Sequence, residues 1–139
     1  MSEPRDPQAV PPTVVLLDTH AFLWFALGDA QMPESAQELV AQATLAYVSA
    51  ASVWEIRTKH RLGKLQAAVG LVGGLPAHIR RLGLTPLAVE VEDADLAGAL
   101  AGAHRDPFDR MLAAQAIQRG ISVVSNDAAL DAFGVARHW

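Results

Sequence analysis

The stretch TVVLLD, residues 13–18, decides the fold class that this sequence predicts. Apolar residues follow one another here without alternating with polar ones, a pattern typical of a strand buried on both faces of a sheet. The strand ends at Asp18. The next two segments, HAFLWFAL and ESAQELVAQA, have helical character and are separated by Gly28 and Pro33. A doubly buried strand followed by helices indicates an α/β protein.

Strands and helices alternate along the rest of the chain. We expect long helices over AASVWEIRTKHRL, VEDADLAGALAGA and DPFDRMLAAQAIQRG, with Gly63 and Gly120 as stops, and shorter ones through Arg80 and over DAALDAF. Further strands are expected over LAYVS, LTPLAV, ISVVS and GVARHW; Pro86 makes LTPLAV an edge strand because proline lacks an N–H donor. This alternation predicts a three-layer α/β/α fold with a central, mainly parallel sheet.

Length and composition suit one globular domain. Of the 139 residues 51% are hydrophobic and 19% are charged, which is enough for one core. Residues 1–12, MSEPRDPQAVPP, are rich in proline and lack the apolar core of a signal peptide, so we expect a mobile leader before a single domain at 13–139. No apolar run approaches the roughly eighteen residues of a membrane-spanning helix, which argues against a membrane protein.

Cysteine is absent and the formal net charge is -4. The chain therefore has no disulfide or thiolate metal ligand, and with no signal peptide expected this favours a cytoplasmic location. The negative charge weighs against binding nucleic acid through overall charge. A local basic cluster could still steer RNA phosphates, although a solvated helix face is the explanation we favour for most of its members. The cluster consists of Arg57, Lys59, His60, Arg61 and Lys64.

Four acids are expected to meet at one edge of the sheet. Asp18 follows the first strand and Asp127 follows the strand ISVVS by two residues. Glu55 lies in the helix that leaves LAYVS, and Asp109 lies in the first turn of the helix that leads into ISVVS. The carboxyl ends of parallel strands share one edge, and a helix that follows or precedes such a strand begins at that edge. All four carboxylates should therefore converge.

Such a cluster predicts a divalent cation. Two carboxylates about 4 Å apart repel by roughly 4 kcal/mol at an effective dielectric of 20, so four need a counter-charge or partial protonation. Oxygen ligands suit Mg²⁺ or Mn²⁺, as one ion or a pair, and the implied reaction is phosphodiester hydrolysis by metal-activated water. Ser125 could add a hydroxyl near the site, and Arg110 could contact a phosphate or a neighbouring acid. His20 and His104 are near this edge, but we do not count them as ligands.

Each acid also has a purely structural explanation. Asp18 could cap the helix after the first strand, and Asp127 could cap the last helix. Glu55 could pair with Lys59 four residues on, in a solvated contact that contributes only a few tenths of a kcal/mol. Convergence at one edge is what favours the functional interpretation for all of them.

The segment HRDPFDRMLAAQA contains two aspartates with different expected roles. Asp106 fits the N-cap, with Pro107 at the first helical position, where its missing N–H costs nothing. Asp109 then falls at the third helical position, where it could complete a capping box or face the other acids. We assign the cap to Asp106 and the metal to Asp109.

Three stretches together resemble a known family: VVLLDTHAFLWFALGD, SAASVWEIRTKHRLGKL and HRDPFDRMLAAQAIQRGISVVSNDAALDAFGV. They are similar to the PIN-domain ribonucleases, most closely to the VapC-type toxins of bacterial type II toxin–antitoxin pairs, over residues 14–139. The resemblance maps the family's metal-binding acids onto Asp18, Glu55, Asp109 and Asp127, with Ser125 in place of the usual threonine. It further implies Mg²⁺ or Mn²⁺, an RNA substrate, a homodimer, and a cognate VapB-type antitoxin whose tail enters the acidic cleft.

The sequence therefore predicts a metal-dependent endoribonuclease that acts as the toxin of such a pair. The alternative is a catalytically inactive PIN-like domain that binds RNA or a partner. A phosphatase with an aspartyl nucleophile is less well supported, because DTH lacks the second acid of an Asp-x-Asp pattern. A phosphoacceptor receiver domain is also less well supported, because no lysine follows VVSND.

Overall fold

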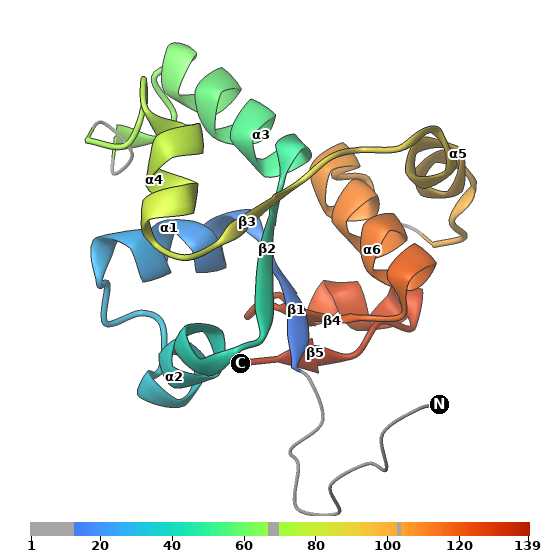
Figure 1. The fold of residues 1–139 in the computed structure, drawn as a ribbon. Coiled ribbons are helices and arrows are strands. Elements are labelled where there is room, and N and C mark those ends of the chain that lie inside the picture. The colour runs from blue at the N-terminus through green and yellow to red at the C-terminus, as the bar shows by residue number, and fades with distance from the viewer. Residues whose placement is uncertain (1–12, 67–69, 103) are drawn as a thin grey trace, which may run out of the picture.

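The computed structural model of the chain describes residues 13–66, 70–102 and 104–139. The predicted leader, residues 1–12, lies outside the described residues. Five strands form one sheet in the order β3-β2-β1-β4-β5, and every neighbouring pair is parallel (Figure 1). This confirms the predicted α/β class and its parallel central sheet. The strands are β1 Val14–Leu17, β2 Leu45–Ser49, β3 Thr85–Leu87, β4 Ser122–Val124 and β5 Arg137–His138.

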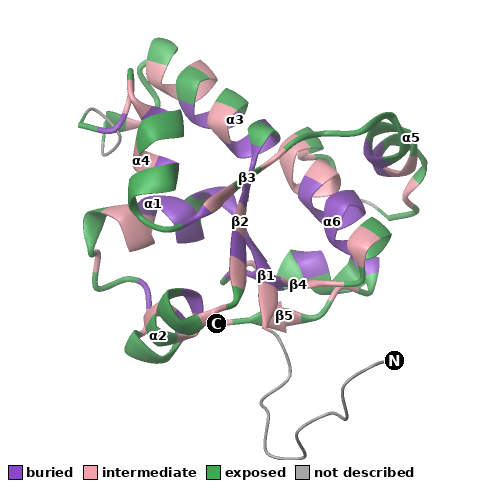
Figure 2. Cartoon of the chain, in the orientation of Figure 1, coloured by how far each residue is buried: buried purple, intermediate pink, exposed green. Residues whose placement is uncertain are grey.

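Strand β1 lies at the centre of the sheet and separates two apolar layers. Val15 and Leu17 point into the cluster that packs against α1 to α4, whereas Leu16 points into the cluster of α6 and the closing helix η2. All three residues are completely buried, and β1 is accordingly mostly purple in Figure 2. The unbroken apolar run of TVVLLD is thus explained, because successive strand residues face opposite layers and both layers exclude water.

Helices cover both faces of the sheet (Figure 1). Glycines in the left-handed conformation end two of them: Gly28 has φ 64° after α1, and Gly120 has φ 63° after α6. Only glycine adopts this conformation without steric cost, so both helices stop there. The helices are α1 Thr19–Leu27, α2 Glu34–Gln42, α3 Ala50–Arg61, α4 Leu75–Arg81, α5 Val91–Ala99, α6 Pro107–Arg119 and the 3-10 helix η2 Ala128–Phe133.

The predicted edge strands and the last helix are found with small differences. LTPLAV and GVARHW contribute only the short outer strands β3 and β5. DAALDAF forms a 3-10 helix rather than an α-helix, because Asp127 caps its start and Gly134, at φ 78°, ends it six residues later. Among the described residues, no helix has the length and apolar character needed to cross a membrane.

A partly buried ion pair ties α5 to α6. The guanidinium of Arg119 donates from Nη1 to Oδ1 of Asp93 at 2.8 Å and from Nη2 to Oδ2 at 3.0 Å. Asp93 is 1% exposed, and the paired hydrogen bonds from Arg119 hold the pKa of its carboxyl below the ordinary value. This pair fixes α5 on the outer side of α6, far along the helix from the predicted acids.

Candidate metal centre

A cavity of about 480 Å³ opens at the carboxyl edge of β1 and β4. Its wall contains all four of the predicted acids, so the structure brings them to one place as the topology argument expected. The lining residues are Asp18, Thr19, His20, Glu55, Lys59, His104, Asp106, Asp109, Asn126 and Asp127.

Asp18 both caps a helix and contributes to the cavity wall. Its Oδ1 accepts a hydrogen bond from the backbone N–H of Ala21 at 2.8 Å, so the structural explanation for this residue holds. The side chain is nevertheless buried beside the other acids, and burial raises the pKa of its carboxyl, partly offset by a hydrogen bond from Ser125. Capping therefore does not remove Asp18 from the candidate site.

Ser125 connects two of the acids. Its Oγ accepts a hydrogen bond from the backbone N–H of Asp127 at 2.9 Å, and its hydroxyl also acts on the Asp18 carboxylate. The side chain is fully buried. It thus holds the turn that carries Asp127 and counteracts the rise in the pKa of Asp18.

Asp106 and Asp109 divide their roles as the sequence suggests. Oδ1 of Asp106 accepts from the N–H of Phe108 at 2.9 Å and from the N–H of Asp109 at 3.3 Å, which is the N-cap of α6. The Asp109 carboxylate instead meets Nε2 of His104 through its Oδ2 at 2.8 Å. Burial raises the pKa of Asp109, and the hydrogen bond to His104 works in the opposite direction.

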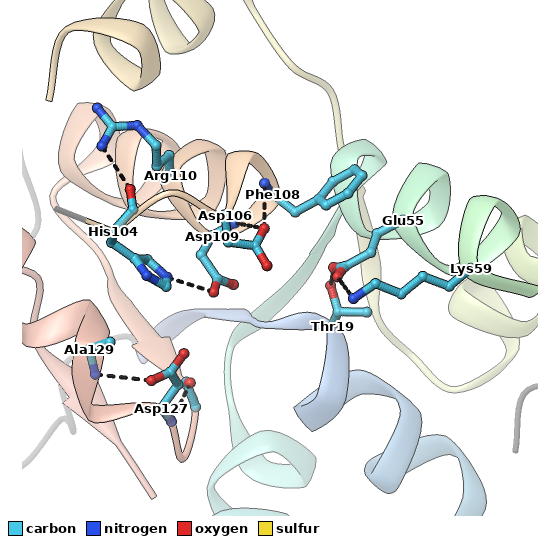
Figure 3. Close-up of polar contacts among 11 residues, drawn as sticks. Thr19, Glu55, Lys59, His104, Asp106, Phe108, Asp109, Arg110, Asp127 and Ala129 are labelled. Atoms are coloured by element: carbon cyan, nitrogen blue, oxygen red, sulfur yellow. Dashed lines mark hydrogen bonds and ion pairs between the residues drawn. The ribbon is translucent and has the colours of Figure 1, made fainter. Parts of the chain in front are cut away.

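Asp109 and Asp127 face each other across the cavity (Figure 3). Together with His104 they offer three ligand atoms that all lie within 4.8 Å of one another. Asp127 also caps η2, since its Oδ1 accepts from the N–H of Ala129 at 3.0 Å. The sequence interpretation did not count His104 as a ligand; its position five residues before Asp109, across the turn at Pro107, is the signal that it shares the site.

Glu55 lies on the other side of the cavity, with partners of its own (Figure 3). Oε1 accepts a hydrogen bond from Oγ1 of Thr19 at 2.5 Å, and Oε2 forms an ion pair with Lys59. The alternative explanation for Glu55 is thus realised in part, although the residue is buried, at 4% exposed, rather than solvated. Its negative charge is already neutralised within the protein.

Arg110 contacts backbone carbonyls rather than a carboxylate. Its guanidinium donates to the carbonyl oxygens of Ala97 at 3.0 Å and His104 at 3.1 Å, and also to that of Leu100. The guanidinium carbon lies 5.7 Å from the ring centroid of Phe133. Arg110 therefore fastens the connection between α5 and α6, including His104, and the structure places it outside the cavity wall.

The donor set fits a hard divalent cation. The carboxylates of Asp18 and Asp109 have raised pKa values because burial disfavours their charged forms, and neighbouring carboxylates add to that effect. A cation relieves this cost, since it supplies opposite charge where water cannot. Carboxylate oxygens are the ligands that suit Mg²⁺ or Mn²⁺, whereas an imidazole in the set is a ligand typical of transition metals.

Fold and site together define a parallel α/β domain with an acidic cavity at the carboxyl edge of its sheet. Comparison with known proteins identifies its family. A family model of the PIN domain matches residues 15–135. The chain therefore belongs to the PIN domain family.

Individual relatives agree with this assignment. The chain is 29% identical over 121 residues to Ribonuclease VapC22 of Mycobacterium tuberculosis, a match covering 85% of this chain and 90% of that protein. A chain of the DNA-bound VapBC2 crystal structure from Rickettsia felis superposes with a TM-score of 0.67 at 15% identity, over 91% of this chain and 98% of that one. A chain of DNA-bound VapBC from Salmonella typhimurium gives 0.67 at 19% identity, over 91% and 97%. The predicted resemblance to VapC-type PIN domains is confirmed.

Proposed function

We propose that this protein is a divalent-metal-dependent endoribonuclease and the toxin of a toxin–antitoxin pair. The observation that carries the proposal is the approach of Asp109, Asp127 and His104 to within 4.8 Å in a cavity whose wall also contains Asp18 and Glu55. Membership of the PIN family and the similarity to a protein named as a ribonuclease support the same reaction.

The acids would hold Mg²⁺ or Mn²⁺, as one ion or two. Bound there, the cation supplies positive charge for the scissile phosphate and lowers the pKa of a coordinated water. The chain's own residues prepare the site: His104 orients the Asp109 carboxylate, and Ser125 orients Asp18. Such outer hydrogen bonds typically affect metal affinity or activity by about 10- to 100-fold.

The proposed partners follow the relatives. RNA is the substrate, and a VapB-type antitoxin inhibits the enzyme, as the VapBC complexes among the similar structures suggest. We further propose that the protein is a homodimer and acts in the cytoplasm. We also propose that its chain consists of a leader at residues 1–12 and one domain over residues 13–139.

Cleavage of RNA by the purified chain tests the proposal. We expect single-stranded RNA to be cut with Mn²⁺ or Mg²⁺, to survive with EDTA, and to be cut again when Mn²⁺ is added in excess. RNA cleavage that is indifferent to the chelator would exclude the mechanism.

One observation favours the alternative of an inactive binding domain. Lys59 already neutralises the Glu55 carboxylate, whereas a cation site would need that carboxylate free to bind the ion. If the protein is an inactive domain that acts by binding, the Asp109→Asn variant should arrest growth as well as wild type does. If it is an enzyme, the Asp109→Asn variant should lose its toxicity. Induction of both forms in cells, with equal expression verified, separates the two functions.

A further inference from the structure

The outer face of α3 carries a stripe of side chains that the acidic cavity does not use. Trp54 has 65% of its surface exposed, which is unusual for so large an apolar side chain. Arg57 and Arg61 follow three and seven residues later, so they lie on the same face of the helix. Both arginines are exposed. We call these three residues the α3 stripe.

The α3 stripe begins next to residues of the acidic cavity wall, although its own side chains are outside that wall. Trp54 directly precedes Glu55, and its ring meets the ring of Phe108 edge to face, with centroids 5.1 Å apart and planes at 72°. Phe108 in turn precedes Asp109, and its ring extends toward α3 (Figure 3). The aromatic pair thus stands beside the acids, with the arginines leading away from them.

Positive charge gathers along the stripe. A hollow of about 580 Å³ beside it is lined by Trp54, Arg57, Thr58, His60, Arg61 and Val72. Across the ranges that the structure describes, neither Arg57 nor Arg61 forms an ion pair. In a chain of net charge -4, two unpaired arginines beside an acidic cavity favour an anionic occupant.

We propose that the α3 stripe binds the single-stranded RNA that leads to the cleavage site. One base stacks on Trp54, and phosphates on either side of it contact Arg57 and Arg61. Stacking on an exposed aromatic ring requires an unpaired base, which makes the occupant single-stranded. The inference rests on the proposed endoribonuclease function, because it names the surface by which that enzyme holds its substrate.

A second copy of the chain fits this face less well. A two-fold interface would bring the same patch of both copies together, and the arginines would then oppose one another. RNA supplies the opposite charge and a flat partner for the indole in one molecule.

Binding without cleavage tests the stripe directly. The full chain carrying Asp109→Asn, free of metal, is titrated against a fluorescein-labelled, unstructured oligoribonucleotide and followed by anisotropy. Adding Trp54→Ala should raise Kd about tenfold, and Trp54→Phe should retain most of the affinity because a stacking ring remains. An abasic nucleotide scanned along the RNA should weaken binding at one position, and that loss should be absent in Trp54→Ala.

Charge is tested separately by salt dependence. Replacing both arginines, Arg57→Gln with Arg61→Gln, should lower the slope of log Kd against log salt by about 1.4, which corresponds to two phosphates of a single strand. The matched control is Arg80→Gln with Arg81→Gln, two exposed arginines on α4. It removes the same charge and should leave the slope unchanged.

The outcomes separate this inference from the proposed function. With metal, Trp54→Ala should raise KM for RNA about tenfold and leave kcat unchanged. If wild type cleaves RNA and the stripe variants have the same KM and Kd as wild type, only the proposed role of the α3 stripe is overturned. A wild type that neither binds nor cleaves RNA would overturn the proposed function and the stripe with it. Conversion of a dimer to a monomer by Trp54→Ala, at unchanged RNA affinity, would show an interface between copies and also overturn the proposal.

Discussion

The two sides of the acidic cavity differ in whether their carboxylates are paired with a basic side chain. On the side of α1 and α3, Glu55 is neutralised by Lys59 and accepts from Thr19. On the side of α6 and β4, Asp109 and Asp127 approach each other with His104 between the elements, and neither forms an ion pair with a lysine or arginine among the described residues. Since uncompensated charge is what a cation relieves, we expect the metal to bind on the second side and Glu55 to play a supporting role.

The largest expected effect is on the side of α6 and β4, which we call the uncompensated side because Asp109 and Asp127 lie there; the side of Glu55 and Lys59 is the compensated side. Asp109→Asn keeps the shape of the side chain but removes its charge, and we expect RNA cleavage to fall about a thousandfold, since several kcal/mol of transition-state stabilisation depend on the cation. Single-turnover cleavage at saturating Mn²⁺ measures this.

Asp106→Asn is the matched control for that variant. It lies three residues away, on the same turn, and asparagine caps a helix about as well as aspartate. Cleavage should therefore stay within about threefold of wild type. An equal loss in the two variants would show that the α6 cap, and not the Asp109 charge, determines activity.

A smaller loss is expected on the compensated side. Glu55→Gln leaves the cation's main ligands in place but releases Lys59 into the cavity, and we expect cleavage to fall between about 10- and 100-fold, as for residues that support a metal site. The same single-turnover assay gives the number. If Glu55→Gln is as inactive as Asp109→Asn, the two sides are equivalent and the comparison fails.

Arg110→Lys tests how the uncompensated side is held. Lysine cannot bind three carbonyls with a planar fork, so the loop carrying His104 should loosen. We expect kcat to fall about tenfold with KM unchanged, and unfolding free energy to fall by about 2 kcal/mol. Urea unfolding monitored by circular dichroism, beside steady-state kinetics, checks both; a change in KM alone would place Arg110 in substrate binding instead.

The smallest effects concern stability and pH. The raised pKa of Asp109 means that its ionised form destabilises the metal-free fold, so Asp109→Asn should melt higher than wild type at neutral pH. This difference should vanish as pH falls through the raised pKa and below the ordinary value of 3.8, because the wild-type carboxyl is then protonated.

Asp93 is the reference, because its ionised carboxyl stabilises the fold whereas that of Asp109 destabilises it. Its lowered pKa means that its contribution is present above the ordinary value of 3.8 and is lost as pH falls through the folded pKa. Asp93→Asn should therefore lower unfolding free energy by about 2 kcal/mol at neutral pH, with a narrowing difference in acid. Melting curves in EDTA at several pH values test both acids. If the stability differences of Asp109→Asn and Asp93→Asn from wild type changed with pH in the same direction, the charges assigned to the two acids would be contradicted.

The fold was predictable because its signals are local. TVVLLD contains the doubly buried strand, and Pro107 and Gly120 mark the ends of α6. The arrival of four acids in one cavity also followed from topology, since strand ends and helix starts share an edge. The 3-10 form of η2 was not predicted, because a segment of six residues between two stops carries too weak a periodicity.

Side-chain partnerships were harder to predict. That Glu55 pairs with Lys59 while remaining buried depends on packing against Thr19, a residue 36 positions away. The contacts of Arg110 with three carbonyls and of His104 with Asp109 depend on the path of the connection between α5 and α6, for which the sequence shows no regular pattern.

Titration with Mn²⁺ followed by calorimetry tests the central claim most directly. We expect wild type to bind Mn²⁺, Glu55→Gln to retain most of that affinity, and Asp109→Asn to lose it. Loss of Mn²⁺ binding in Glu55→Gln together with retention in Asp109→Asn would contradict the assignment of the metal to the side of Asp109 and Asp127.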